Sequence, residues 1–271
     1  MAPGTESQTF WDHLEALRGV LIRVAVAVCV VGIGAFAAMP WLFDNFILAP
    51  CHPDFILYKL LAGLNSTGIL PSQLSDATFS LEPVSLELTS QFLIHVTASC
   101  WLAMIIGFPI IIYLLWGFVS PALYDHEKRG IRKAFIAGNL MFYLGAAVGY
   151  LIVFPLALRF LATYSLSAGI HAMVSLESYM DNFFTLILAM GAVFELPLLA
   201  WLLGRMGLLT RGFFKKYRRH AIVLLLIMAA LITPTGDPFT LLIVFIPLYA
   251  LWEAGAMLVP KTSDDVSETE T

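Results

Sequence analysis

Six long apolar segments follow one another along the chain, and shorter segments between them carry most of the charged residues. The apolar segments are residues 21–43, 92–118, 135–154, 183–203, 221–232 and 239–259. A helix needs about 20 apolar residues to cross the hydrocarbon core of a bilayer, and all but 221–232 reach that length. The pattern predicts an all-α, polytopic integral membrane protein with six transmembrane helices.

The fifth apolar segment is shorter than a full span, and a polar turn at residues 233–238 follows it. As a helix, residues 221–232 would be about 18 Å long. Two arrangements fit this length: a re-entrant pair buried in protein, or two short crossings. We favour two crossings, because the turn is too polar to end within hydrocarbon.

The first helix is expected to begin before its apolar part. Phe10, Leu14, Leu17 and Leu21 recur with the spacing of one helix face. The spacing predicts a helix that starts near Thr9, amphipathic at first and apolar beyond residue 21.

The positions of basic residues predict the orientation of the spans. Of the 15 Lys and Arg residues, only Lys59 and Arg159 lie outside the segments that the six crossings place on one side. Basic residues collect on the cytoplasmic side, so both termini are expected there. Residues 44–91 then form a long external loop, expected to pack as a cap with short helices. Residues 1–260 are predicted to form one membrane domain, followed by an acidic, disordered tail at 261–271.

The amino-acid composition excludes several classes of protein. Hydrophobic residues make up 59% of the chain and charged residues 13%, against about 25% charged in ordinary soluble domains. This excludes a soluble enzyme, a disordered protein and a nucleic-acid binder. The sequence contains no metal-binding histidine pair, nucleophile motif or phosphate-binding loop. We therefore expect no catalytic residues, no metal, no cofactor and no enzymatic activity.

Glu195 is the main candidate for a functional side chain. It lies ten residues before Arg205, which marks the end of the fourth span, and so about 15 Å deep in the membrane. An ionisable residue at this depth is by default a functional candidate. Pro197 lacks a backbone N–H and should bend the helix beside it. The alternative is a structural hydrogen bond to a neighbouring helix.

Other polar candidates lie at the ends of the spans. Glu127 belongs to the segment 118–129 after the second span, Glu15 and Arg18 lie on the amphipathic start of the first helix, and Glu253 lies near the end of the last span. Each has a simpler interpretation. Glu127 can be neutralised by the basic residues that follow it in an interfacial turn, Glu15 can face solvent, and Glu253 can reach the interface.

Several motifs occur together in a recognisable order and spacing from residue 13 to residue 253. They are His13-Leu14, Leu17-Arg18, residues 118–129, Val153-Phe154-Pro155-Leu156, Phe194-Glu195-Leu196-Pro197, Thr233-Pro234 with Asp237, Ile246-Pro247-Leu248-Tyr249 and Glu253. In this combination the chain resembles TatC, the polytopic core of the twin-arginine protein translocase. The similarity covers nearly the whole chain.

The resemblance implies a concave, cup-like arrangement of six helices with the last two short. It implies a receptor in the cell inner (cytoplasmic) membrane that binds the twin-arginine signal peptides of folded export substrates. Export would be driven by the proton-motive force. The implied partners are single-span proteins of the TatA and TatB type, in a complex with several copies of the chain.

The resemblance also assigns roles to residues. Glu127 matches the family's signal-binding glutamate, with Phe118, Pro121 and Leu123 as its neighbours. Glu195 matches the intramembrane glutamate, and Asp237 an acidic residue of the last external turn. Thr233 and Glu253 are implied to meet TatA and TatB.

One motif departs from the family pattern. The usual start is His-Leu-x-Glu-Leu-Arg, whereas here Glu15 occupies the x position and Ala16 the glutamate position. Adjacent residues differ by about 100° around a helix. Either Glu15 substitutes for the family glutamate in this contact, or Glu127 acts with fewer partners.

Two rival functions remain. A proton-coupled small-solute transporter would use Glu195, but would be expected to show internal repeats, and none is evident. An intramembrane hydrolase would need a nucleophile with a base, or a metal site, within the spans.

Overall fold

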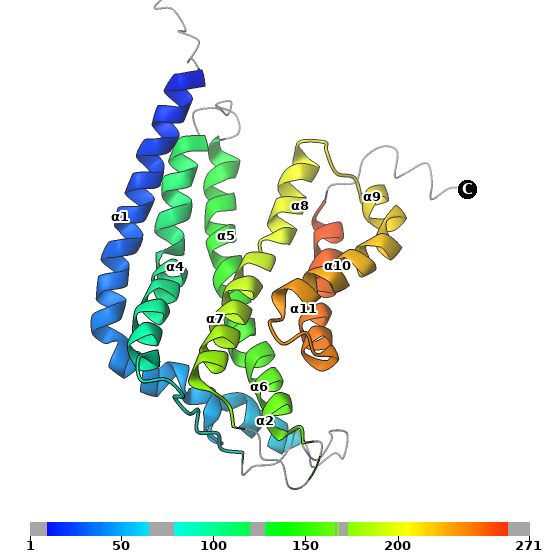
Figure 1. Ribbon diagram of the computed structural model, residues 1–271. Helices are drawn as coiled ribbons and strands as arrows, with labels where there is room; N and C mark the ends of the chain where they lie inside the picture. The colour runs from blue at the N-terminus through cyan, green and yellow to red at the C-terminus, as the bar shows by residue number, and fades with distance from the viewer. Residues whose placement is uncertain (1–9, 65–78, 120–127, 166, 168–172, 260–271) are drawn as a thin grey trace, which may run out of the picture. The chain divides into compact units, whose positions relative to one another are not determined.

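The computed structural model describes residues 10–64, 79–119, 128–165, 167 and 173–259. These residues are almost entirely helical (Figure 1), which confirms the predicted all-α class. The chain divides into two compact units, residues 1–40 with 95–139 and residues 41–94 with 140–271.

The first unit contains most of α1 (Phe10–Leu42), most of α4 (Ser90–Val119) and the start of α5 (Lys128–Val148). Near one end of the α1–α4 pair, the rings of Phe36 and His95 stack with centroids 3.9 Å apart. The Nε2 atom of His95 lies 2.9 Å from the carbonyl oxygen of Phe36. Further along, the helices approach so closely that a Cβ on Gly32 would lie 3.6 Å from the Cβ of Ala103. Helix α1 is described from Phe10 onward, and the predicted start near Thr9 lies outside the described residues.

The second unit begins with residues 41–94, whose described part contains a π-helical turn, a 3₁₀ turn and a short helix. The remaining elements are the end of α5 and the helices that follow it. They are η1 (Phe43–Ile47), η2 (Ala49–Cys51), α2 (Ile56–Leu64), η5 (Gly149–Val153), α6 (Phe154–Thr163), α7 (Leu176–Val193), α8 (Leu196–Arg205), α9 (Arg211–Lys216), α10 (Arg218–Ile232) and α11 (Pro238–Leu258).

The core of the second unit is aromatic, and it holds the described part of residues 44–91 against α6 and α7. The ring of Phe154 meets those of Tyr179 and Phe183 edge to face, at centroid distances of 5.2 and 5.1 Å. Such aromatic pairs stabilise a core beyond the area that they bury. The Tyr179 hydroxyl donates to the carbonyl oxygen of Ile47, and the Tyr58 hydroxyl donates to that of Pro50 at 2.9 Å. The described part of the loop therefore packs as the sequence predicted.

Three glycines allow α5 and η5 to pack closely against α7. A Cβ on Gly145 would lie 2.5 Å from the carbonyl oxygen of Met190, and one on Gly149 would lie 3.0 Å from the Cα of Ile187. From the other side, a Cβ on Gly191 would lie 2.8 Å from the ring of Phe142. Gly145 and Gly149 form a Gly-x-x-x-Gly motif, which lets helix backbones approach in membranes.

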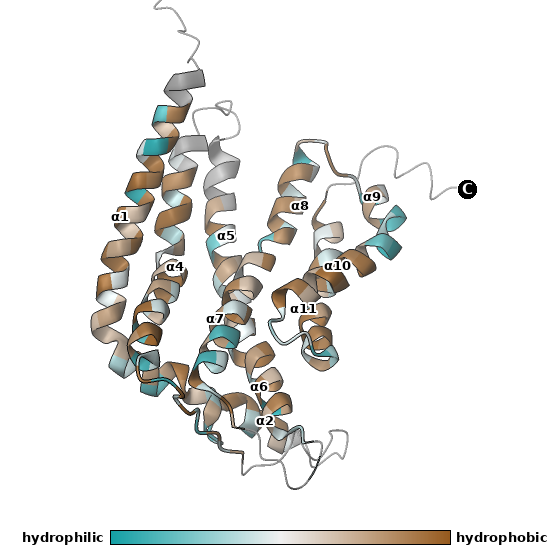
Figure 2. Ribbon diagram, viewed as in Figure 1, coloured by the Kyte–Doolittle hydropathy of each residue, from teal (hydrophilic) through white to brown (hydrophobic). Residues whose placement is uncertain are grey.

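Most predicted spans correspond to long apolar helices. Five stretches among the described residues are long and apolar enough to cross a membrane, and they are brown along most of their length in Figure 2. They lie within Leu14–Gly63, Ser90–Leu115, Phe135–Thr163, Leu176–Arg205 and Pro238–Leu258. The predicted fifth span corresponds to α10, whose 15 residues measure about 22 Å. A crossing by α10 therefore stays a prediction.

Candidate functional site

Glu195 lies where the fourth predicted span breaks. Helix α7 ends at Val193 and α8 begins at Leu196, so the chain makes a turn at residues 194–195. The Glu195 N–H donates to the carbonyl oxygen of Ala192 at 3.2 Å, and the Leu199 N–H donates to that of Glu195 at 2.9 Å. Pro197, in the first turn of α8, has no N–H to donate to the preceding helix. The local bend predicted from Pro197 is confirmed.

The Glu195 carboxyl group is partly buried in apolar surroundings. Its Oε1 atom is buried and has no hydrogen-bond partner among the described residues. The adjacent Phe194 side chain packs over Gly145, where a Cβ would lie only 2.7 Å away. On the other side, Pro197 and Ala200 of α8 pack against Gly255 of α11. Since buried polar atoms are normally paired, this oxygen is an acceptor available to a group outside the described chain.

The turn between α10 and α11 is closed by two of the predicted residues. The buried Thr233 hydroxyl donates to the carbonyl oxygen of Ala229 at 3.0 Å, at the end of α10. Asp237 caps α11, because its Oδ1 accepts from the Thr240 N–H at 2.7 Å and its Oδ2 accepts from the Thr235 hydroxyl at 2.6 Å. Burial acts to raise the pKa of Asp237, but these hydrogen bonds outweigh it and hold the pKa below its usual value. Both residues shape the turn.

Glu253 near the end of α11 takes part in an interhelical contact. Its Oε1 lies 2.8 Å from Nε of Arg218 at the start of α10. The same Nε donates to the Tyr249 hydroxyl at 2.9 Å. The Tyr249 hydrogen bond and the charge of Glu253 raise the pKa of Arg218. Glu253 thus joins α11 to α10. The simpler interpretation, in which the Glu253 side chain only reaches the membrane interface, did not include this contact.

The predicted signal-binding residues are only partly within the described chain. Glu127, Pro121 and Leu123 lie outside the described residues, and Phe118 is described only as backbone at the end of α4. Glu15 and Arg18 are exposed on α1. Helix α1 is uninterrupted there, so Glu15 and residue 16 occupy faces about 100° apart.

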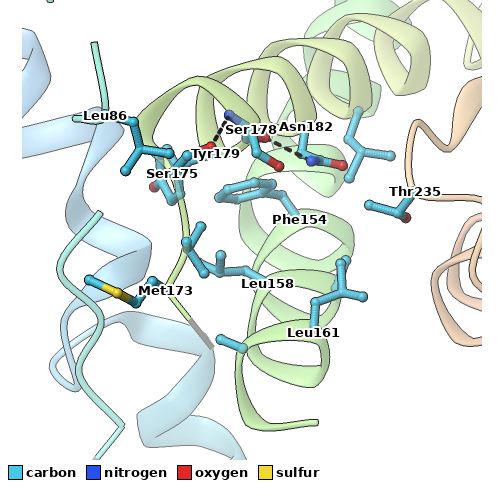
Figure 3. Close-up of a pocket in the computed structure, with 14 residues that line it drawn as sticks. Leu86, Phe154, Leu158, Leu161, Met173, Ser175, Ser178, Tyr179, Asn182 and Thr235 are labelled. Carbon is cyan, nitrogen blue, oxygen red and sulfur yellow. Dashed lines mark hydrogen bonds between the residues drawn. The ribbon is translucent and has the colours of Figure 1, made fainter. Parts of the chain in front are cut away.

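A pocket of about 380 Å³ lies between α6, α7 and the turn before α11, and the sequence did not predict it (Figure 3). Phe154 and Leu158 give it an apolar wall, and Thr235 borders it. Ser178 and Asn182 add polar groups one helical turn apart, and the Asn182 amide donates to the Ser178 carbonyl oxygen at 2.7 Å. The available signal was the polar first half of α7, where Ser178 and Asn182 are spaced at i and i+4.

These features define a class of protein: a helical integral membrane protein with a span broken at an ionisable residue. Among the described residues, no group of His, Cys, Asp or Glu is placed to hold a metal ion. Comparison with protein-family models matches residues 12–247 to Sec-independent protein translocase protein (TatC). The chain belongs to the TatC family, which confirms the resemblance found in its motifs.

Known TatC proteins are similar to this chain over almost its whole length. The chain is 34% identical over 246 residues to the Sec-independent protein translocase protein TatC of Blattabacterium, covering 90% of this chain and 92% of that one. It is 31% identical over 256 residues to TatC of Deinococcus radiodurans, covering 94% and 87%. A crystal structure of the twin arginine translocase receptor TatC superimposes with a TM-score of 0.67 at 29% identity, covering 91% of this chain and 97% of that chain. The chain is a protein translocase component, and the solute-transporter alternative gains no support.

Proposed function

We propose that this chain is the receptor subunit of a twin-arginine translocase and binds the signal peptides of folded proteins. The observation that carries the proposal is the broken span at Glu195, which offers an unpaired buried oxygen at a position matching the family motif. The name of the superimposed crystal structure, twin arginine translocase receptor, supports the same role.

The chemistry of a twin-arginine signal suits the candidate residues. Each guanidinium is always charged and forms paired hydrogen bonds with a carboxylate. Glu127, flanked by Phe118, Pro121 and Leu123, supplies such a carboxylate, and Glu15 with Arg18 forms a second charged surface on α1. The apolar part of the signal then lies beside the partly buried Glu195, whose Oε1 has no hydrogen-bond partner among the described residues.

The proposed topology places the charged candidates where a signal first arrives. With six crossings, 13 of the 15 basic residues lie in the cytoplasm together with both termini, as the positive-inside rule requires. The chain is then a multi-pass protein of the cytoplasmic membrane. A single membrane domain over 1–260 and a disordered tail at 261–271 are part of this proposal.

Partners of the TatA and TatB type are proposed to dock on the last two helices. Thr233 closes one end of α10, and Glu253 joins α11 to α10 at the other. Between them, Ile227 and Leu231 of α10 and Ile246 of α11 are exposed apolar residues, which suit a partner helix. Several copies of the chain assemble with these partners, and the proton-motive force drives export without an enzymatic step.

Binding of a twin-arginine peptide tests the receptor role. Glu127→Lys should weaken binding by one to two orders of magnitude, since a hydrogen bond to a charged group contributes about 1.5–3 kcal/mol. A peptide with both arginines replaced by lysine should bind weakly to the unmodified protein. The matched control is Glu82→Lys, an equal charge change at an exposed residue of the external loop. Unchanged binding by Glu127→Lys would refute the assignment of this residue, and equal binding of both peptides would refute the receptor role.

A further inference from the structure

A second pocket, of about 260 Å³, lies at the C-terminal end of α11, between that helix, α9 and the start of α10. The receptor role leaves it unexplained. Arg211, Lys215 and Arg218 line it, with Phe214 and Trp252 beside them. Figure 2 shows the junction of α9 and α10 as a hydrophilic segment next to the apolar α11.

The pocket carries more positive than negative charge. Its one carboxylate, Glu253, pairs with Arg218 at 2.8 Å. Arg211 donates to the carbonyl oxygens of Val259 and Met257 at 2.8 and 2.7 Å, which holds its guanidinium in place without neutralising it. Lys215 is exposed and has no hydrogen-bond or ion-pair partner among the described residues. The pocket therefore offers an ammonium group and a fixed guanidinium to an anion.

The floor of the pocket is apolar and aromatic. Phe214 is buried, and its ring lies 4.7 Å from that of Trp252, centroid to centroid. Met257 lines the pocket and is exposed. At the end of α8, the guanidinium of Arg205 lies 4.8 Å from the ring centroid of Trp201. Tryptophan and basic side chains gather at the level of lipid headgroups. An anion with an apolar part therefore fits this pocket better than an anion without one.

We propose that this pocket binds an anionic glycerophospholipid. The phosphate lies between Lys215 and Arg211, and the glycerol and first acyl carbons lie along Trp252 and Met257. Basic pockets at the ends of transmembrane helices suit such headgroups. The acidic tail at 261–271 is a competing anion, because only Pro260 separates it in sequence from Val259. Its only large apolar residue is Val266, so it does not match the aromatic floor.

Lipid titration of the purified full-length protein in detergent tests the proposal. Native mass spectrometry would count bound phosphatidylglycerol, with phosphatidylcholine of the same acyl chains as the uncharged comparison and glycerol phosphate as the headgroup alone. Phosphatidylglycerol should bind more tightly than either. Lys215→Gln should weaken its binding about fivefold, the contribution of one basic side chain near an anionic lipid.

Lys216→Gln is the matched control, because Lys216 follows in the same short helix, is exposed and does not line the pocket. It should bind phosphatidylglycerol like the unmodified protein. Equal losses in both variants would overturn the proposal in favour of a general surface charge. Binding of glycerol phosphate as tight as that of the lipid would overturn the role of the apolar floor.

A tail variant separates the lipid from the chain's own anion. Asp264→Asn, Asp265→Asn, Glu268→Gln and Glu270→Gln together remove the four acidic groups of the tail. Unchanged lipid binding in this variant supports the proposal. Lipid binding that appears only in this variant would show that the tail occupies the pocket, and would overturn it.

Discussion

Substitution of Gly145 by alanine tests the close packing that holds the Glu195 break in place. The new Cβ would lie 2.5 Å from the carbonyl oxygen of Met190 and 2.7 Å from the Cβ of Phe194. Neither neighbour is the flexible end of a long side chain, so α5 and α7 must separate by about half an ångström or more. Overpacking of this kind costs about 1–3 kcal/mol.

Thermal unfolding of the purified protein in detergent measures this effect. The midpoint of Gly145→Ala should fall by on the order of 5 °C, and the movement of Phe194 should also weaken signal-peptide binding through its neighbour Glu195. Gly34→Ala is the matched control, since Gly34 also lies within a predicted span but a Cβ there meets nothing within 4 Å. Alanine is the better helix former, so this control should unfold at or above the temperature of the unmodified protein. An unchanged midpoint for Gly145→Ala would refute the described packing.

Three further predictions concern the polar candidates. Glu195→Gln and Glu195→Ala should both fold, since Oε1 has no partner among the described residues, but only Gln should retain protein export in cells at matched expression. Equal defects would instead require a charge or a titrating proton. Glu15→Ala should weaken binding of a twin-arginine peptide about tenfold; if it has no effect while Ala16→Glu strengthens binding, the family's usual position is the relevant one. Asp237→Ala should lower stability by about 1 kcal/mol through loss of the α11 cap. Since its folded pKa lies below the usual value, this contribution is complete at neutral pH and is lost below about pH 4, so unfolding midpoints of the two proteins should converge in acid; a constant difference down to pH 3 would exclude the charged cap.

The sequence predicted the features that depend on local pattern. The length of each apolar segment identified five candidate spans, and Pro197 located the break beside the partly buried Glu195. The turn at 233–238 was predicted from its composition, and the structure places Asp237 there as the cap of α11. Such features follow from hydrophobicity and backbone chemistry, and both can be read from one short segment of the sequence.

Contacts between distant segments were not predictable in this way. The pairing of Glu253 with Arg218 joins two helices, and neither residue's neighbours in sequence indicate it. The packing of Gly145 and Gly149 against α7 was not predicted. Glycine in an apolar helix indicates close packing, but it does not show which helix is the partner. The signal-binding role of Glu127 stays a prediction, since it lies outside the described residues.

The π-helical turn η5 places its own first residue and the first residue of α6 on the same side of the chain. Gly149 and Phe154 are five residues apart, yet both pack against α7, whereas an α-helix returns to one face after three or four. A π turn accommodates one residue more than an α-helical turn. Deletion of a single residue within 149–153 would convert the π turn into an α-helical turn. The residues on both sides of it would still face α7. Relatives that differ here by one residue in length can therefore share the same buried surface, and an alignment gap within this helix is compatible with an intact fold.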